Sequence, residues 1–189
     1  MTGPRAPQGG RGPACDTEPI VIRALAATDG MVLKDVRLRA LRDAPLAFTQ
    51  TVADVEHDPD DEWFEWAGEM SVDGGDSATY LAFGHDPAVA IGMAGGYLHR
   101  EDPAEAVVWG VWVDPAARGS GIGRDLVSAV IDWATTRGCE RVTLCVTDTS
   151  GAAISLYREL GFSHHGPLRP HRHLPGATET SMIKVLVRS

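Results

Sequence analysis

The sequence predicts a mixed α/β fold, and three observations carry that prediction. Apolar, strand-like runs dominate the middle of the chain, and apolar residues at helical spacing stand before and after them. A strand-like run at residues 107–113 is followed by a helical pattern and then by a second such run at residues 141–146. A strand–helix–strand passage of this kind makes its two strands parallel neighbours in one sheet. We therefore expect a mixed sheet in which one parallel pair joins an antiparallel meander.

Length and composition fit one globular domain. The chain has 189 residues, of which 43% are hydrophobic and 23% are charged, and a chain of this size buries a core without disulfides. Residues 1–18 are rich in Gly, Pro and Arg and nearly free of large apolar side chains. We therefore expect a disordered N-terminal tail over residues 1–18 and a folded domain over residues 19–189.

Charge and cysteine content narrow the class of protein further. A net charge of −9 speaks against a general nucleic-acid binder. There is no run of about 18 apolar residues that would span a membrane, and the N-terminus lacks the apolar core of a signal peptide. The three cysteines, Cys15, Cys139 and Cys145, have no metal-type spacing, which indicates reduced thiols and a cytoplasmic location.

The sequence pattern in the first third of the chain predicts a short strand and two helices. Residues 20–22 form the strand. The first helix follows Thr28 or Asp29, either of which offers an N-cap, and it ends at Ala44 and Pro45 because proline disfavours helical backbone in the residue before it. A second helix begins after Asp60. The apolar face of the first helix is Leu33, Val36, Ala40 and Leu41, and that of the second is Trp63, Trp66, Ala67 and Met70.

Four strands are expected in the centre of the chain. Residues 79–83 and 88–97 pair across a turn at residues 85–87. Residues 107–113 are apolar except for Gly110, which is typical of a strand covered on both faces. Residues 141–146 alternate between apolar and other side chains.

Two helices and a last strand complete the prediction. The helix between the third and fourth strands ends at Gly138, a residue suited to left-handed backbone. Its buried face is Ile122, Leu126, Val127, Val130, Ile131 and Ala134. The last helix runs from about Gly151 to Gly161. Four of its residues lie on one face: Ala153, Leu156, Tyr157 and Leu160. Residues 183–187 form the final strand.

A glycine-rich turn opens the central helix and indicates an anion site. The strand at residues 107–113 ends at Asp114 and Pro115, and residues 118–124 read Arg-Gly-Ser-Gly-Ile-Gly-Arg. Glycines let backbone N–H groups approach a ligand, and the first N–H groups of a helix are unpaired and carry partial positive charge. Phosphate or pyrophosphate suits such a turn, and Arg118 and Arg124 add positive charge. The alternative is a tight strand-to-helix connection without a ligand.

The turn fits neither of two common nucleotide motifs. No Gly-Lys-Ser/Thr follows the glycines, which excludes a Walker loop, and Arg124 stands where a dinucleotide fingerprint needs Gly or Ala. Instead, the turn and the last helix together resemble the GNAT acyltransferase superfamily. Its pyrophosphate motif, Arg/Gln-x-x-Gly-x-Gly/Ala, is matched by Arg118, Gly121 and Gly123. Its later motif is matched by Ala153, Ile154, Leu156, Tyr157, Leu160, Gly161 and Phe162.

The resemblance covers about residues 19–189, including residues 39–48, which look like the first helices of many such proteins. One position departs from the pattern: Ser150 stands where the family usually has Asn, seven residues before Tyr157. Its hydroxyl either contacts the cofactor or caps the last helix, and the cap is the favoured interpretation.

The resemblance implies a GNAT fold, in which the parallel strands at residues 107–113 and 141–146 splay apart in the centre of the sheet. It implies acetyl-CoA as cosubstrate, held between those strands and on the glycine-rich turn, and no metal. It implies Tyr157 as the catalytic acid that protonates the departing thiolate; the alternative is a core aromatic. The implied cofactor-binding residues are Val111, Trp112, Val113, Arg118, Gly119, Ser120, Gly121, Ile122, Gly123, Arg124 and Ser150.

The general base is left open by the sequence. Many relatives use a Glu on the strand at residues 107–113, which has none here. Nearby candidates are Glu105, Asp148, His99, Glu101 and Asp102, although loop charges in solvent are the favoured interpretation for each.

Two further features of the sequence stay open. The histidines at 164, 165, 171 and 173 lie among prolines, which indicates an irregular loop beside the substrate rather than a metal site. Trp109 or Trp112 is a candidate wall of the acceptor pocket.

The function implied is an acetyl-CoA-dependent N-acetyltransferase that acts on the primary amine of a small molecule. Two alternatives remain: a non-catalytic module that binds acyl-CoA, and an acetyltransferase for protein or peptide amines. Neither a nucleic-acid nor a membrane partner is expected, and a homodimer is left open.

Overall fold

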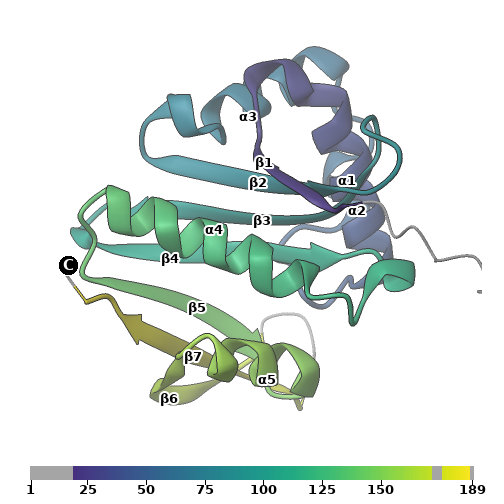
Figure 1. Ribbon diagram of the computed structural model, residues 1–189. Coiled ribbons are helices and arrows are strands. Elements are labelled where there is room, and N and C mark those ends of the chain that lie inside the picture. The colour runs from purple at the N-terminus through teal and green to yellow at the C-terminus, as the bar shows by residue number, and fades with distance from the viewer. Residues whose placement is uncertain (1–18, 172–175, 188–189) are drawn as a thin grey trace, which may run out of the picture.

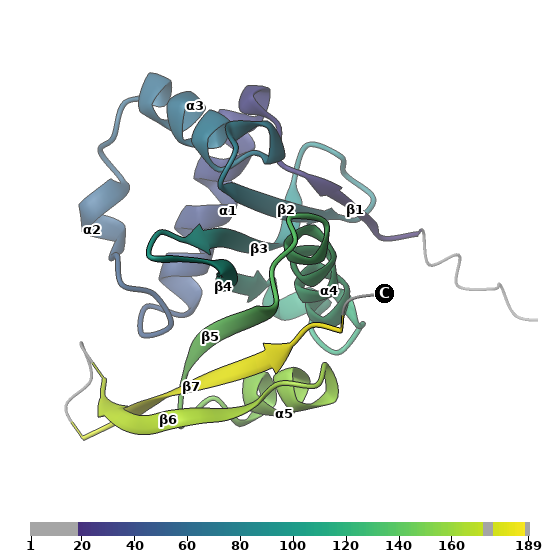
Figure 2. The ribbon, with the colours of Figure 1, turned by 90° about the vertical axis from the view of Figure 1, so that its left-hand side faces the viewer.

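The computed structural model describes residues 19–171 and 176–187. It contains a seven-stranded sheet in the order β1-β2-β3-β4-β5-β7-β6, in which only the β4–β5 pair is parallel. Helices α1 to α3 lie on one face of the sheet and α4 and α5 on the other (Figures 1 and 2). The predicted mixed, mostly antiparallel sheet with one central parallel pair is confirmed. The predicted tail, residues 1–18, lies outside the described residues.

The elements follow one another as strands and helices with short connections. The strands are β1 Val21–Ala24, β2 Ser77–Phe83, β3 Ala90–His99, β4 Asp102–Val113, β5 Arg141–Thr147, β6 Ser163–Pro170 and β7 Thr178–Val185. The helices are α1 Gly30–Asp43, α2 Val52–Val55, α3 Asp60–Glu69, α4 Ile122–Thr136 and α5 Gly151–Glu159. In this part of the chain, no helix is long and apolar enough to cross a bilayer.

Each face of the sheet has its own core, and each core uses the predicted helix faces. Helices α1 and α3 bury Leu33, Val36 and Trp63 against β2, β3 and β4. Helix α4 buries Leu126 and Val130 against the opposite face, where α5 adds its side chains. Burial of these apolar faces, rather than local propensity, supplies most of the stability of such helices.

The parallel strands β4 and β5 separate, and Gly110 is the local cause. Pairing between them runs only from Glu105 opposite Arg141 to Val107 opposite Thr143. Further along β4, the register with β3 shifts around Gly110, which has a φ of +63°. An extra residue in one strand is a β-bulge, which bends the strand, and glycine accepts positive φ without strain. Beyond this bulge β4 bends away from β5.

Two predictions about the elements are wrong, and two features were missed, namely helix α2 and the start of β7, which was predicted at residue 183. Strand β4 begins at Asp102, so Glu105 lies within it rather than before it. The histidine loop is in part strand β6, because a register shift between His165 and Arg169 accommodates its prolines at the edge of the sheet.

Candidate active site

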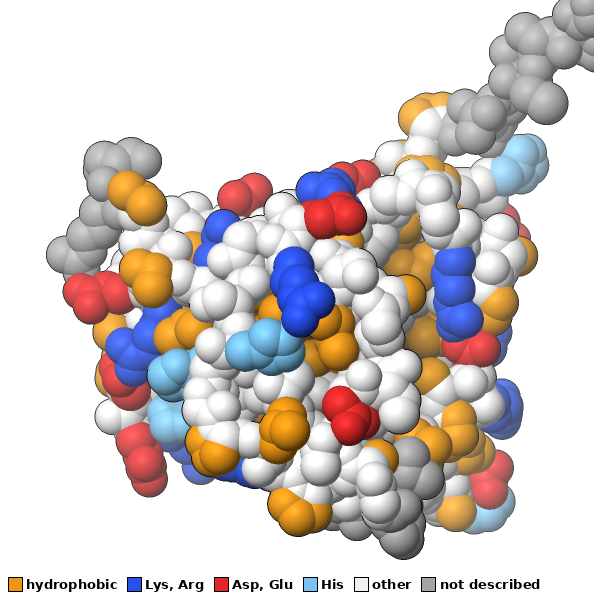
Figure 3. Space-filling view, turned by 90° about the horizontal axis from the view of Figure 1, so that it is seen from below, with side chains coloured by type: hydrophobic (Ala, Val, Ile, Leu, Met, Phe, Trp, Pro, Cys, Tyr) orange, Lys and Arg blue, Asp and Glu red, His pale blue; other side chains and the backbone are white. Residues whose placement is uncertain are grey.

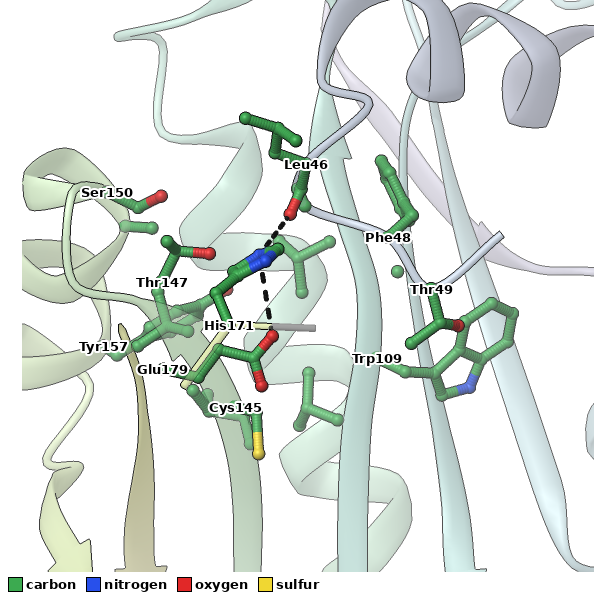
Figure 4. Close-up of a pocket in the computed structure, with 17 residues that line it drawn as sticks. Leu46, Phe48, Thr49, Trp109, Cys145, Thr147, Ser150, Tyr157, His171 and Glu179 are labelled. Carbon is green, nitrogen blue, oxygen red and sulfur yellow. Dashed lines mark hydrogen bonds and ion pairs between the residues drawn. The ribbon is translucent and has the colours of Figure 1, made fainter. Parts of the chain in front are cut away.

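A cavity of about 240 Å³ lies where β4 and β5 separate (Figure 4). Its walls come from the loop after α1, from β4 and β5, from the start of α5, and from β7 with the residue that follows β6. It is lined by Leu46, Ala47, Phe48, Thr49, Val108, Trp109, Gly110, Val111, Leu144, Cys145, Val146, Thr147, Ser150, Ala153, Tyr157, His171 and Glu179. The cavity therefore combines an apolar wall with several polar groups, as small-molecule sites do.

Tyr157 reaches this cavity from α5. Tyr157 is 6% exposed, and its ring packs edge-on against the Phe162 ring with a centroid distance of 6.0 Å. Burial raises the pKa of the Tyr157 phenol to about 12, because the phenolate would lose its hydration. The phenol is therefore protonated at neutral pH, which is the form that a proton donor requires.

His171 and Glu179 also line the cavity. The sequence placed His171 only in a loop beside the substrate and gave Glu179 no role. The His171 side chain is 2% exposed, and its Nε2–H donates to the carbonyl oxygen of Leu46 at 2.9 Å. The Glu179 Oε1 atom lies 3.6 Å from the same His171 Nε2 (Figure 4). The alternation of β7 gives one signal: Met182 is buried in the core on the α4 side, so Glu179, an odd number of positions away, faces the opposite side of the sheet.

The apolar wall of the cavity is held from behind by Arg37 on α1. Its guanidinium carbon lies 4.6 Å from the Phe48 ring centroid and 5.6 Å from that of Trp109. Its Nη2 donates to Gln50 Oε1 at 2.9 Å. Burial lowers the pKa of the Arg37 guanidinium to about 10, so it stays charged at neutral pH. Arg37 therefore stabilises the loop that carries Phe48.

Arg37→Lys is expected to lower the free energy of unfolding by about 1–3 kcal/mol. An ammonium cannot reproduce the planar contact with both rings, and the half-buried amide oxygen of Gln50 would lose its donor. Urea unfolding measures the difference, with Arg42→Lys on the exposed face of the same helix as the control. Equal stability of the two variants would contradict the role given to Arg37.

The glycine-rich turn has the geometry of an anion site. Gly119 and Gly121 have φ values of +81° and +91°. In α4, the first N–H bonded within the helix is that of Asp125, which donates to the Gly121 carbonyl oxygen at 3.1 Å. A Cβ built on Gly121 would meet no atom within 4 Å, so the space in front of the turn is open. The first N–H groups of α4 are therefore not bonded within the helix, which is what the predicted anion site requires.

The two arginines of the turn are less available than the sequence indicates. Arg118 pairs with Asp43 at the end of α1 and also donates from Nε to the Val113 carbonyl oxygen at 3.0 Å. Arg124 pairs with Glu159 on α5. Each positive charge therefore has a carboxylate beside it, which corrects the expectation that these side chains give the turn a net positive charge.

The other predicted cofactor residues divide between the cavity and its surroundings. Val111 and Ser150 line the cavity. Ser150 stands at the N-cap of α5, but its hydroxyl makes no capping hydrogen bond, so the favoured cap interpretation is wrong. Trp112 is buried, and its Nε1–H donates to Asp43 Oδ2 at 2.8 Å, so its ring does not form the cavity wall. Trp109 does.

The carboxylates proposed as bases are engaged elsewhere. Glu105 accepts from Arg141 Nε at 2.9 Å and from Thr143 Oγ1 at 2.8 Å. Asp102 pairs with the same arginine, which holds the pKa of that carboxyl below its usual range. Asp148 accepts from Thr178 Oγ1 at 2.6 Å, and this bond likewise lowers its pKa.

The remaining two base candidates, His99 and Glu101, line a second and more open cavity of about 740 Å³ at the turn between β3 and β4. None of the five residues proposed as bases therefore lines the cavity that contains Tyr157.

The described histidines lie in different places. His171 faces the cavity, whereas His164 on β6 bonds to Arg158 at 2.9 Å and to Thr180 at 3.0 Å. Figure 3 shows the underside of the molecule, where histidine and basic side chains lie close together. No group of three or more His, Cys, Asp or Glu side chains in residues 19–171 and 176–187 is arranged to hold a metal ion. His173 lies outside the described residues.

Comparison with known proteins identifies the family. Residues 38–162 match the model of the acetyltransferase (GNAT) family. The chain belongs to this family. The mixed sheet with one parallel strand pair matches the fold of solved GNAT structures.

Two curated relatives and one solved structure illustrate the range of the family. The mycothiol acetyltransferase of Amycolatopsis mediterranei is 33% identical over 136 residues, which cover 69% of this chain and 41% of that protein. The N-alpha-acetyltransferase RimI of Mycobacterium tuberculosis is 31% identical over 171 residues, which cover 88% of this chain and 93% of that protein. The structure of yncA from Salmonella typhimurium with its cofactor acetyl-CoA has a TM-score of 0.71 and 20% identity, and the match covers 90% of this chain and 95% of that one.

The two curated relatives differ in how much of their length is matched. The chain spans less than half the length of the mycothiol acetyltransferases but nearly the whole length of RimI.

Proposed function

We propose that this GNAT domain transfers the acetyl group of acetyl-CoA to the primary amine of a small molecule. The observation that carries the proposal is the cavity between β4 and β5, which contains Tyr157 and adjoins the strand that leads into the glycine-rich turn. The turn would bind the pyrophosphate of CoA through its backbone N–H groups. The thioester would then lie in the gap that the bulge at Gly110 opens.

The chemistry needs an acid, and Tyr157 is suited to that role. Acetyl transfer makes an amide and expels CoA as a thiolate. A protonated phenol beside the sulfur would stabilise the departing charge by giving up its proton. Burial keeps that proton on Tyr157 until the charge develops.

A thiol-release assay with acetyl-CoA and a panel of amines tests the proposal. We expect CoA release that depends on an amine, together with an acetylated product detected by mass spectrometry. CoA binding without turnover on any amine would instead indicate the non-catalytic binding module.

A protein or peptide N-terminus is the second candidate acceptor, and the comparison with RimI favours it, because that match covers 93% of a protein named as an N-alpha-acetyltransferase. The cavity is smaller than the ~300–1,000 Å³ typical of ligand pockets, so only the amine end of an acceptor would enter it. Including short peptides with free N-termini in the panel separates the two acceptors by their kcat/KM values. We further propose a cytoplasmic location, with which the free thiols of Cys139 and Cys145 agree.

A further inference from the structure

Among the residues that line the cavity with Tyr157, Glu179 is the one carboxylate in the described part of the chain. It comes from β7, where it lies opposite Thr147 of β5 and Arg169 of β6. Its side chain is 34% exposed, so it contacts both the cavity and the solvent. Strand β7 pairs with β5 on the side away from β4, and the Glu179 side chain nevertheless lines the cavity at the gap between β4 and β5.

Glu179 is held toward the cavity from one side. The buried His171 side chain is fixed by its bond to Leu46, and the Glu179 carboxylate lies 3.6 Å from that ring. His171 therefore connects Glu179 with the loop that carries Phe48.

We propose that Glu179 is the residue that binds the acceptor as an ammonium ion and removes its proton. This inference rests on the proposed acetyl transfer. A primary alkylamine is mostly protonated at neutral pH, since its pKa is close to the value of about 10.4 found for lysine. An ammonium ion has no lone pair with which to attack, so a carboxylate that first attracts the cation and then takes its proton serves both needs.

The proposed step balances in protons and bonds. Glu179 takes one proton from the ammonium ion, and the nitrogen lone pair forms a bond to the thioester carbonyl carbon. The carbon–sulfur bond then breaks, and the sulfur leaves with the electron pair and receives the phenol proton of Tyr157. The tyrosinate recovers a proton from the new amide nitrogen, and Glu179 releases its proton to solvent. The net reaction converts an ammonium ion and acetyl-CoA into an amide, CoA and one proton.

The substitution Glu179→Gln tests this role, because it keeps the shape of the side chain and removes the charge. We expect kcat/KM for a primary alkylamine to fall by roughly 100-fold or more, while the Kd for CoA from calorimetry is unchanged. With hydroxylamine, which is already neutral at the assay pH, we expect a loss of less than about 10-fold, since no proton need be removed before attack. Glu62→Gln, at an exposed carboxylate on α3 outside this cavity, is the matched control and should retain wild-type rates with both acceptors.

Each other outcome overturns one identified part of the account. Equal losses with the alkylamine and hydroxylamine, or no loss with either, would overturn the role of Glu179 and leave the acetyltransferase activity standing. A wild-type protein that acetylates no amine would overturn the proposed function itself.

If Glu179→Gln does not fold, the variant Glu179→Asp serves instead, because it keeps the carboxylate on a side chain that is shorter by one methylene. We then expect the same preferential loss with the alkylamine, and its absence would contradict the proposal.

Discussion

Tyr157→Phe is expected to lower kcat by roughly 100-fold or more, the usual scale for the loss of a general acid. The variant keeps the ring that packs against Phe162 and removes only the hydroxyl, so folding and CoA binding should survive. The loss should appear in kcat rather than in the KM for acetyl-CoA, because the proton is needed only as charge develops on sulfur. Rates measured under conditions in which chemistry is limiting check this expectation.

The pH dependence gives the same experiment a second readout. Because burial raises the pKa of Tyr157 to about 12, the phenol is protonated well below that value, and it would be lost as a donor only as the pH rises through it. The ratio of wild-type to Tyr157→Phe rates should therefore be constant from about pH 6 to about pH 9. A Tyr157→Phe protein with near-normal kcat would leave Tyr157 as a core aromatic and solvent as the proton donor.

Gly121→Glu is expected to abolish measurable CoA binding. The new side chain would extend into the open space in front of the turn, where the pyrophosphate should lie, and it would add a negative charge there. Calorimetry with CoA measures the loss, and circular dichroism checks that the protein is folded. Unchanged CoA affinity in a folded Gly121→Glu variant would contradict the assignment of the turn.

Gly138→Glu is the matched control for that variant. Gly138 follows the other end of α4, has a φ of +80°, and likewise has no atom within 4 Å of a built Cβ. The Gly138→Glu substitution therefore adds the same side chain with a similar backbone strain, of about 1–2 kcal/mol, but at the end of the helix that is far from the turn. Comparable stability of the two variants and a normal Kd for CoA in Gly138→Glu would separate the loss of the site from a loss of fold.

Features encoded by neighbouring residues were predictable from the sequence. The glycine-rich turn, the buried face of α4 and the position of Tyr157 on α5 all follow from spacing within a short stretch. The parallel β4–β5 pair follows from the crossover that α4 forms. The prediction that Tyr157 is the acid that protonates the thiolate came from the resemblance, since spacing alone does not distinguish it from a core aromatic.

Features that depend on distant residues were not predictable in the same way. Arg118 meets Asp43, 75 positions away, so its charge is offset by a residue that no local pattern connects to it. Prolines at 167 and 170 made β6 look like a loop, although an edge strand with a register shift accommodates them. Without β6, the start of β7 was also missed, and with it the position of Glu179 beside the cavity.

A crystal structure of the chain with acetyl-CoA would show whether the cavity between β4 and β5 is the site of acetyl transfer. We expect the pyrophosphate to lie against the backbone N–H groups of residues 119–124. We expect the thioester to lie between β4 and β5, with the Tyr157 hydroxyl near its sulfur. Acetyl-CoA bound elsewhere, or bound with its acetyl group outside the cavity, would contradict the claim that this cavity is the site of acetyl transfer.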